Sequence, residues 1–123
     1  MISHSQIVQS VAYALAHLDD EGRLESTTLV SLVIVQNRIR ECPSLEKGKV
    51  IRQILSETID NLLGSDALSL HEPVSQYLDL RYRQGLAMKE IVRRMGYSRE
   101  YITRRYRRAA LHRITTALVD LPN

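Results

Sequence analysis

The chain has 123 residues, with 17 Lys and Arg against 14 Asp and Glu, so it forms one small domain or two very small ones, and a large multidomain enzyme is excluded. It contains no Trp, no Phe and only five Gly and three Pro, a composition that favours helices over a turn-rich β-sandwich. The single cysteine, Cys42, cannot form an internal disulfide, which indicates a reducing, cytoplasmic location. No stretch approaches the roughly 18 apolar residues of a membrane span, so no membrane partner is expected.

The formal net charge of +3 is unevenly distributed along the chain. Residues 1–76 hold six basic and ten acidic residues, a net charge of −4, whereas residues 77–123 hold eleven basic and four acidic residues, a net charge of +7. A basic end on an otherwise acidic chain indicates a polyanionic partner. The alternative is a solvated charged helix face, which carries no function.

Apolar residues at helical spacing predict three helices in the first half of the chain. The first covers residues 5–18 and is broken by the residues 19–22. The second covers 28–40, with Leu29, Leu32, Val33, Gln36 and Ile39 on one face, although the β-branched run 29–35 is also compatible with a buried strand. The third follows a break at 42–44, carries a long stripe from Val50 to Leu63, and ends at Gly64.

Three further helices are predicted after a polar connection at 65–73. They cover 74–83, with Gly85 as the stop, 88–95, and 98–118, with Ser98 as the N-cap. The expected fold is therefore all-α with about six helices, a three-helix N-terminal domain over 1–70 and a second domain over 71–123. We expect the first domain to support self-association or another protein contact.

The fifth and sixth predicted helices have the layout of a helix-turn-helix, since eight helical residues precede a glycine turn and a longer helix begins at a capping serine. Gly96 can adopt the left-handed conformation that lets two helices meet steeply across a three-residue turn. We expect a small core between the two helices, formed by Ile91, Met95, Tyr97 and Ile102, with Leu86 and Ile114 as outer anchors.

The stretch from Tyr77 to Leu118 resembles the C-terminal, promoter-reading domain of bacterial sigma factors and related regulators. The matching parts are "LRYRQGL" (80–86), "KEI" (89–91), the glycine turn, "SRE" (98–100), Ile102 and "RRA" (107–109). The resemblance implies that the last helix lies in the major groove of DNA, with Arg99, Glu100 and Arg104 at base-reading positions. It also implies phosphate contacts from Ser98, Arg105 and Arg108.

The angular positions of the charges on this helix agree with that implication. With Arg104 set at zero and about 100° per residue, Glu100, Arg107 and Arg108 lie within about 60° of it, whereas Ile102, Tyr106 and Ala109 lie on the opposite face. Arginine can bond a guanine edge in two places, and glutamate can accept a bond from cytosine. Arg107, Tyr101 and Thr103 are expected to join the phosphate contacts. Glu100 has a purely structural alternative, an ion pair with Arg104 one turn away.

The tyrosines of the basic half raise the alternative of single-strand binding by base stacking. Helical spacing instead places Tyr77, Tyr82, Tyr97 and Tyr106 on core faces, and only Tyr101 toward the charged face.

No metal site, cofactor site or catalytic residue is expected, because the four histidines are scattered and Cys42 and Ser44 belong to no nucleophile motif. The main prediction is a bacterial transcriptional regulator that binds double-stranded DNA as a homodimer, with RNA polymerase or other transcription machinery as a further partner. The alternatives are a protein-interaction module whose basic helix docks an acidic partner, and a protein that binds RNA or single strands.

Overall fold

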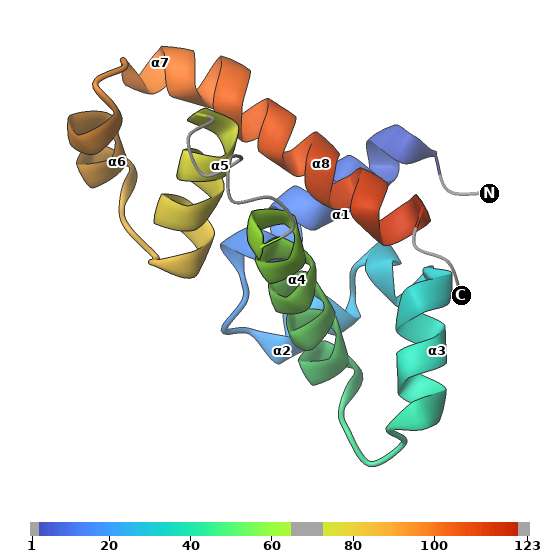
Figure 1. Ribbon diagram of the computed structural model, residues 1–123. Helices are drawn as coiled ribbons and strands as arrows, with labels where there is room; N and C mark the ends of the chain where they lie inside the picture. The colour runs from blue at the N-terminus through green and yellow to red at the C-terminus, as the bar shows by residue number, and fades with distance from the viewer. Residues whose placement is uncertain (1–2, 65–72, 121–123) are drawn as a thin grey trace. The chain divides into compact units, whose positions relative to one another are not determined.

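The computed structural model describes residues 3–64 and 73–120, and within them the chain is helical with no strand (Figure 1). The all-α fold class is thereby confirmed. Contacts divide the chain into two compact units. The first unit comprises Met1–Thr58 together with Ile114–Asn123, and the second comprises Ile59–Arg113. The helices α4 (Lys47–Gly64) and α8 (Arg108–Asp120) contribute residues to both units. The boundary expected between residues 70 and 71 lies outside the described residues.

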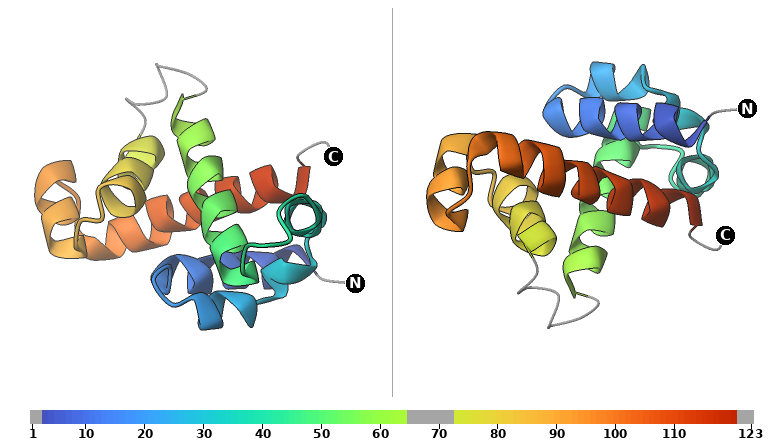
Figure 2. Two further views of the ribbon diagram at one scale, coloured as in Figure 1. Left: turned by 90° about the horizontal axis from the view of Figure 1, so that it is seen from below. Right: turned by 90° about the horizontal axis from the view of Figure 1, so that it is seen from above.

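The first unit begins with α1 (His4–Ala16), whose start is fixed by a reciprocal cap. The Ser3 hydroxyl accepts a hydrogen bond from the Gln6 backbone N–H at 3.2 Å, and the Ser3 N–H donates to the Gln6 side chain at 2.9 Å. The side chains of Ile7, Val11, Ala14 and Leu15 are buried along one face. Figure 2 shows this helix beside the chain that follows it, α2 (Glu21–Glu25) and the 3-10 turn η1 (Thr28–Ser31).

The residues expected to break the first helix lie after its end and also start a new helix. Asp20 is the N-cap of α2, because its carboxylate accepts a hydrogen bond from the Arg23 backbone N–H at 3.2 Å. This short helix buries Leu24 completely. The predicted break after the first helix is confirmed, since α1 ends at Ala16, but the short helix α2 was not predicted.

The helix predicted over 28–40 is two elements, η1 and α3 (Val33–Glu41), separated by the extended residue Leu32 with ψ 143°. The Gln36 side-chain amide donates to the Val30 carbonyl at 2.5 Å, which satisfies a backbone acceptor at this break. The break changes which residues face inward, so Val35 is buried and Val33 is 55% exposed. The predicted placement of Val33 on the buried face was wrong, as was the strand alternative.

The first turn of α4 packs closely against α2 within the first unit. A Cβ at Gly48 would lie 2.4 Å from the Glu21 carbonyl oxygen, so only glycine fits there without movement. The Arg52 guanidinium donates to the Leu18 carbonyl at 2.7 Å and lies 3.5 Å from the Glu21 carboxylate. Further along α4 the predicted apolar stripe is confirmed, since Val50, Ile51, Ile54, Leu55, Ile59 and Leu63 are all buried.

The second unit contains α5 (Pro73–Leu78), the π-helical turn η3 (Asp79–Arg83), α6 (Met88–Met95), α7 (Arg99–Tyr101), the π-helical η4 (Ile102–Arg107) and the first turns of α8. The three elements α7, η4 and α8 form one uninterrupted helical stretch. Gly85 follows η3 with φ 70°, a left-handed conformation, and the Leu86 N–H then donates to the Leu80 carbonyl at 2.9 Å. The core of this unit is built from Tyr77, Leu78, Ile91, Ile102, Tyr106 and Ala110.

No helix in residues 3–64 or 73–120 combines the length and the apolar character needed to cross a membrane.

Candidate nucleic-acid interface

The turn between α6 and α7 is fixed by two local backbone features. Gly96 ends α6 with φ 78° and ψ 15°, and its N–H donates to the Val92 carbonyl at 3.0 Å. Ser98 caps the next helix, since its hydroxyl accepts a hydrogen bond from the Tyr101 N–H at 3.1 Å. Both roles agree with the sequence prediction, and together they hold α6 and α7 at a defined turn.

The core beneath this turn is smaller than expected. Ile91 and Ile102 are fully buried, and Met95 is half-buried. Tyr97, which was placed in this core, is instead 40% exposed, so that prediction was wrong. Its ring stacks on the ring of Tyr101, with centroids 5.1 Å apart and planes inclined by 24°. The backbone leaving the left-handed Gly96 thus directs the aromatic side chain outward.

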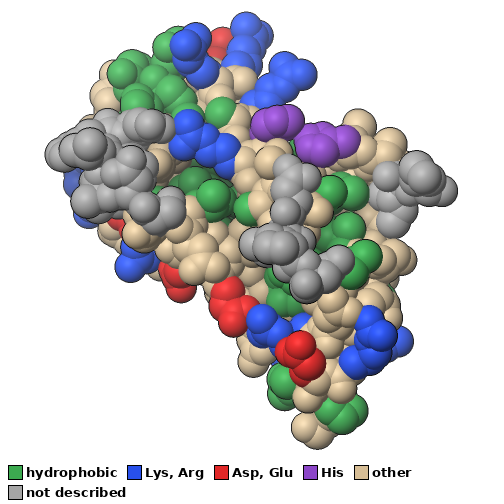
Figure 3. Space-filling model, turned by 45° about the vertical axis from the view of Figure 1, so that its right-hand side comes forward, with side chains coloured by type: hydrophobic (Ala, Val, Ile, Leu, Met, Phe, Trp, Pro, Cys, Tyr) green, Lys and Arg blue, Asp and Glu red, His purple; other side chains and the backbone are tan. Residues whose placement is uncertain are grey.

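The basic segment, residues 98–108, carries five arginines and one glutamate. Four of the arginines are exposed and Arg107 is half-buried. None of the five forms an ion pair with a carboxylate in the described parts of the chain; they are Arg99, Arg104, Arg105, Arg107 and Arg108. Lys and Arg side chains gather at the top of the face drawn in Figure 3, on the side where Figure 1 places α7.

The arginines of the neighbouring helix α6 behave differently. Arg93 and Arg94 both pair with the Glu90 carboxylate, at 2.8 and 3.3 Å. In η3, Arg83 likewise lies 3.6 Å from Asp60 and 3.8 Å from Asp79. Carboxylates of the same unit therefore balance the charge of these flanking arginines, whereas no carboxylate in the described residues pairs with the arginines of the basic segment.

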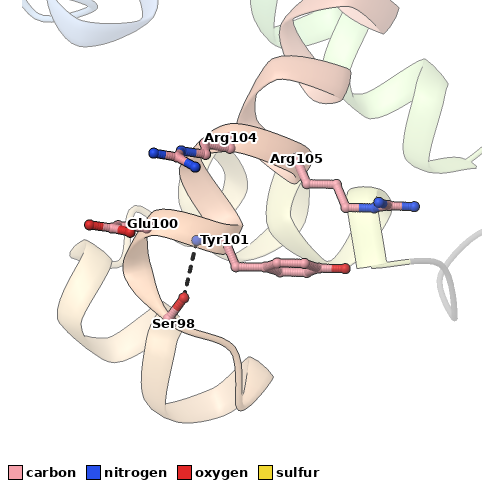
Figure 4. A pocket seen from close by; sticks show the side chains of 5 residues that line it. All are labelled: Ser98, Glu100, Tyr101, Arg104 and Arg105. Atoms are coloured by element: carbon pink, nitrogen blue, oxygen red, sulfur yellow. Dashed lines mark hydrogen bonds between the residues drawn. The ribbon is translucent and has the colours of Figure 1, made fainter.

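Glu100 and Arg104 project from the same side of the helix, one turn apart, in Figure 4. Glu100 and Arg104 form no ion pair with each other, so the structural alternative for Glu100 is not realised in this conformation. Tyr101 and Arg105 project in a different direction, and the Arg105 guanidinium carbon lies 6.0 Å from the centroid of the Tyr101 ring. Together with Ser98, these four side chains line an open hollow of about 480 Å³.

Tyr106 lies beneath the two exposed tyrosines and is nearly fully buried. Its ring meets those of Tyr97 and Tyr101 edge-on, with centroid distances of 5.4 and 5.5 Å. Burial, assisted by the neighbouring Tyr97 and Tyr101 hydroxyls, raises the pKa of the Tyr106 hydroxyl well above its usual value. Tyr106 is therefore the buried ring on which the two exposed tyrosines pack.

All nine side chains expected to contact DNA lie within this one stretch, and Thr103 is exposed there. Tyr97 is an exposed aromatic side chain beside them that the sequence prediction did not place there, and its only signal was its position directly after the turn glycine. Within residues 3–64 and 73–120, no three His, Cys, Asp or Glu side chains form a group that could hold a metal ion.

Comparison with known proteins adds no assignment, because no family model, no curated protein and no solved structure matches the chain. The chemistry of the basic segment is therefore the ground for a functional proposal.

Proposed function

We propose that the protein binds double-stranded DNA through the basic segment and acts as a transcriptional regulator. The observation that carries the proposal is the set of five arginines that have no carboxylate partner among the described residues, beside flanking arginines that do. A protein segment that concentrates unpaired cations on one helical stretch is suited to a polyanion. A helix is about 10–12 Å across, close to the width of the DNA major groove.

Base recognition is assigned to Arg99, Glu100 and Arg104. An arginine fork can bond the O6 and N7 atoms of guanine, and a carboxylate can accept a hydrogen bond from the N4 amino group of cytosine. Glu100 and Arg104 leave the helix on the same side without pairing, so both are free to meet adjacent base edges (Figure 4). This pair is the specificity-determining part of the proposal.

Phosphate contacts are assigned to the remaining polar side chains of the basic segment, namely Ser98, Tyr101, Thr103, Arg105, Arg107 and Arg108. Such contacts fix the orientation of the helix and carry no sequence information. If the three arginines of this group each neutralise one phosphate, the logarithm of affinity falls with the logarithm of salt concentration with a slope of about −2.7 per chain. A fourfold rise in salt then weakens binding about 40-fold.

The first experiment is selection of bound sequences from a random duplex library, followed by mobility shifts on the selected site at low salt. Arg104→Ala is expected to relax base preference and to cost on the order of 1–3 kcal/mol. Arg107→Ala is expected to weaken all sequences alike and to flatten the salt slope by about 0.9. Arg23→Ala is the matched control, because it removes one exposed, paired arginine of the first unit and should change neither quantity.

Absence of duplex binding at low salt overturns the proposal. Binding to an acidic protein without binding to DNA points to the interaction module. Preference for RNA or a single strand of the same sequence also contradicts the assignment to duplex DNA.

A lone helix-turn-helix contacts few bases, and such proteins commonly bind two half-sites as dimers. We therefore extend the proposal to a homodimer, formed through the first unit, that regulates transcription in the bacterial cytoplasm and contacts RNA polymerase or other transcription machinery. A strict monomer by light scattering, both free and on the selected site, would exclude the dimer without affecting the assignment of the DNA-binding face.

A further inference from the structure

We infer that Tyr97 and Tyr101 form a stacking platform for an unpaired DNA base beside the arginines of the basic segment. The inference rests on the proposed DNA binding and adds a ligand class that double-strand recognition does not include. It starts from the outward position of Tyr97, which helical spacing did not predict.

The platform is already assembled in the free protein. Tyr97 is 40% and Tyr101 41% exposed, and their rings stack with centroids 5.1 Å apart. The buried Tyr106 supports both rings edge-on, at 5.4 and 5.5 Å. Because the rings hold one another in place, an incoming base meets a fixed aromatic surface and little side-chain freedom is lost on binding.

The chemistry around the platform matches a nucleotide. Arg105 lies against the Tyr101 ring, and these two side chains line a hollow with Ser98, Arg104 and one carboxylate, that of Glu100. Cations beside exposed aromatic rings are the arrangement that holds nucleic-acid strands, since the cations meet phosphates and the rings meet base faces. A fully paired duplex has its base faces covered by stacking, so only an unpaired base can use the rings.

The charge of the surroundings favours this occupant over an apolar one. The other exposed side chains of the basic segment are polar or charged, and an apolar protein surface would have to cover arginines that have no carboxylate to pair with. Stacking requires only a base face, so the platform is expected to accept any of the four bases.

The experiment compares three DNAs that share one sequence. The first is fully paired, the second has one extra unpaired adenine, and the third has an abasic residue in place of that adenine, which keeps the distortion of the backbone and removes the base. Fluorescence anisotropy at one salt concentration gives the three affinities. Stacking of one base on aromatic side chains predicts tighter binding to the adenine bulge than to the abasic bulge by about 5- to 150-fold.

Tyr97→Leu is expected to remove this difference. Because Tyr97 packs on Tyr101, which is assigned a phosphate contact, any change in duplex affinity through Tyr101 should affect the adenine and abasic bulges alike. Tyr97→Trp retains an aromatic face and should keep the difference. Circular dichroism melting verifies that both variants fold. Replacing the unpaired adenine by 2-aminopurine provides a second measurement, since stacking on the platform changes its fluorescence and Tyr97→Leu should abolish that change.

Equal affinity for the adenine and abasic bulges, or an unchanged difference in folded Tyr97→Leu, overturns the inference. If the paired duplex is bound in these cases, the proposed function stands and the platform alone is rejected. If no form of the DNA is bound, both are rejected.

Discussion

Replacing Gly48 with alanine tests the close approach of α4 to α2 on which the first unit is built. The new methyl group would lie 2.4 Å from the Glu21 carbonyl oxygen, 2.8 Å from its Cβ and 2.9 Å from its carbonyl carbon. Two of these three atoms belong to the backbone, so rotation of a side chain cannot relieve the overlap. The first turn of α4 must move away from α2.

The expected cost follows from three contributions. Overpacking of this kind costs about 1–3 kcal/mol. The movement also strains the hydrogen bond from Arg52 to the Leu18 carbonyl, at 2.7 Å, which is worth about 1 kcal/mol. The higher helix propensity of alanine offsets up to about 1 kcal/mol of this loss of stability. The net loss of stability is about 1–3 kcal/mol, or a fall in Tm of roughly 4–12 °C for a chain of this size.

Circular dichroism melting and urea denaturation measure this loss, and Gly22→Ala is the matched control. Gly22 is also helical, but its nearest neighbour is an Asp20 carboxylate oxygen at an ordinary 3.6 Å, so this variant should be as stable as the parent or up to about 1 kcal/mol more stable. If Gly48→Ala melts no lower than the parent while Gly22→Ala behaves as expected, α2 does not lie against α4 at this distance and the reasoning fails.

Three further outcomes are expected from the same measurements. Gly96→Ala should lose about 1–2 kcal/mol because its left-handed φ of 78° is strained for alanine, and Gly96→Asn should lose less; similar stability for all three proteins would contradict the turn geometry. Val35→Ala should cost about 2 kcal/mol, whereas the exposed Val33→Ala should change stability by less than about 0.5 kcal/mol. A larger loss for Val33→Ala than for Val35→Ala would contradict the break at Leu32 and support one continuous helix over residues 28–40. The raised pKa of Tyr106 means that the folded chain keeps a proton that the unfolded chain loses near pH 10. The contribution of Tyr106 to the free energy of unfolding should therefore be constant below about pH 10 and should decrease above it. Urea midpoints for the parent and Tyr106→Phe, compared between about pH 8 and about pH 11, test this, and an equal alkaline loss in both would refute the role of Tyr106.

The helices that could be predicted from the sequence are those whose signals are local. The stripe from Val50 to Leu63 is long and regular, so one register accounts for it. The turn at Gly96 and Ser98 was predictable because a left-handed glycine and a capping serine each act through their own backbone and their nearest neighbours. The fold class followed from these elements.

The parts that were mispredicted depend on contacts between segments or on choices that local propensity leaves balanced. Leu32 carries no turn signal, and the break there is accompanied by a side-chain bond from Gln36 to Val30. The short helix α2 was missed because Asp20 favours a turn as well as a helix cap, and the burial of Leu24 accompanies the cap. Tyr97 was assigned to the core by spacing alone, although a residue next to a left-handed glycine no longer follows the period of the preceding helix.

In the candidate interface, sequence spacing likewise does not determine which arginines form ion pairs. Glu90 and Arg94 are four residues apart, as are Glu100 and Arg104, with the glutamate first in both cases, yet only the first pair forms. An exposed pair at this spacing is worth about 0.3–0.5 kcal/mol, less than the thermal energy, so sequence spacing cannot decide which pairs form. Discrimination by an arginine bonded in two places to guanine is worth about 1–3 kcal/mol. DNA would therefore displace a Glu100–Arg104 pair even where it formed transiently, and the proposed reading of bases by Arg104 does not depend on the conformation that Glu100 adopts in the free protein.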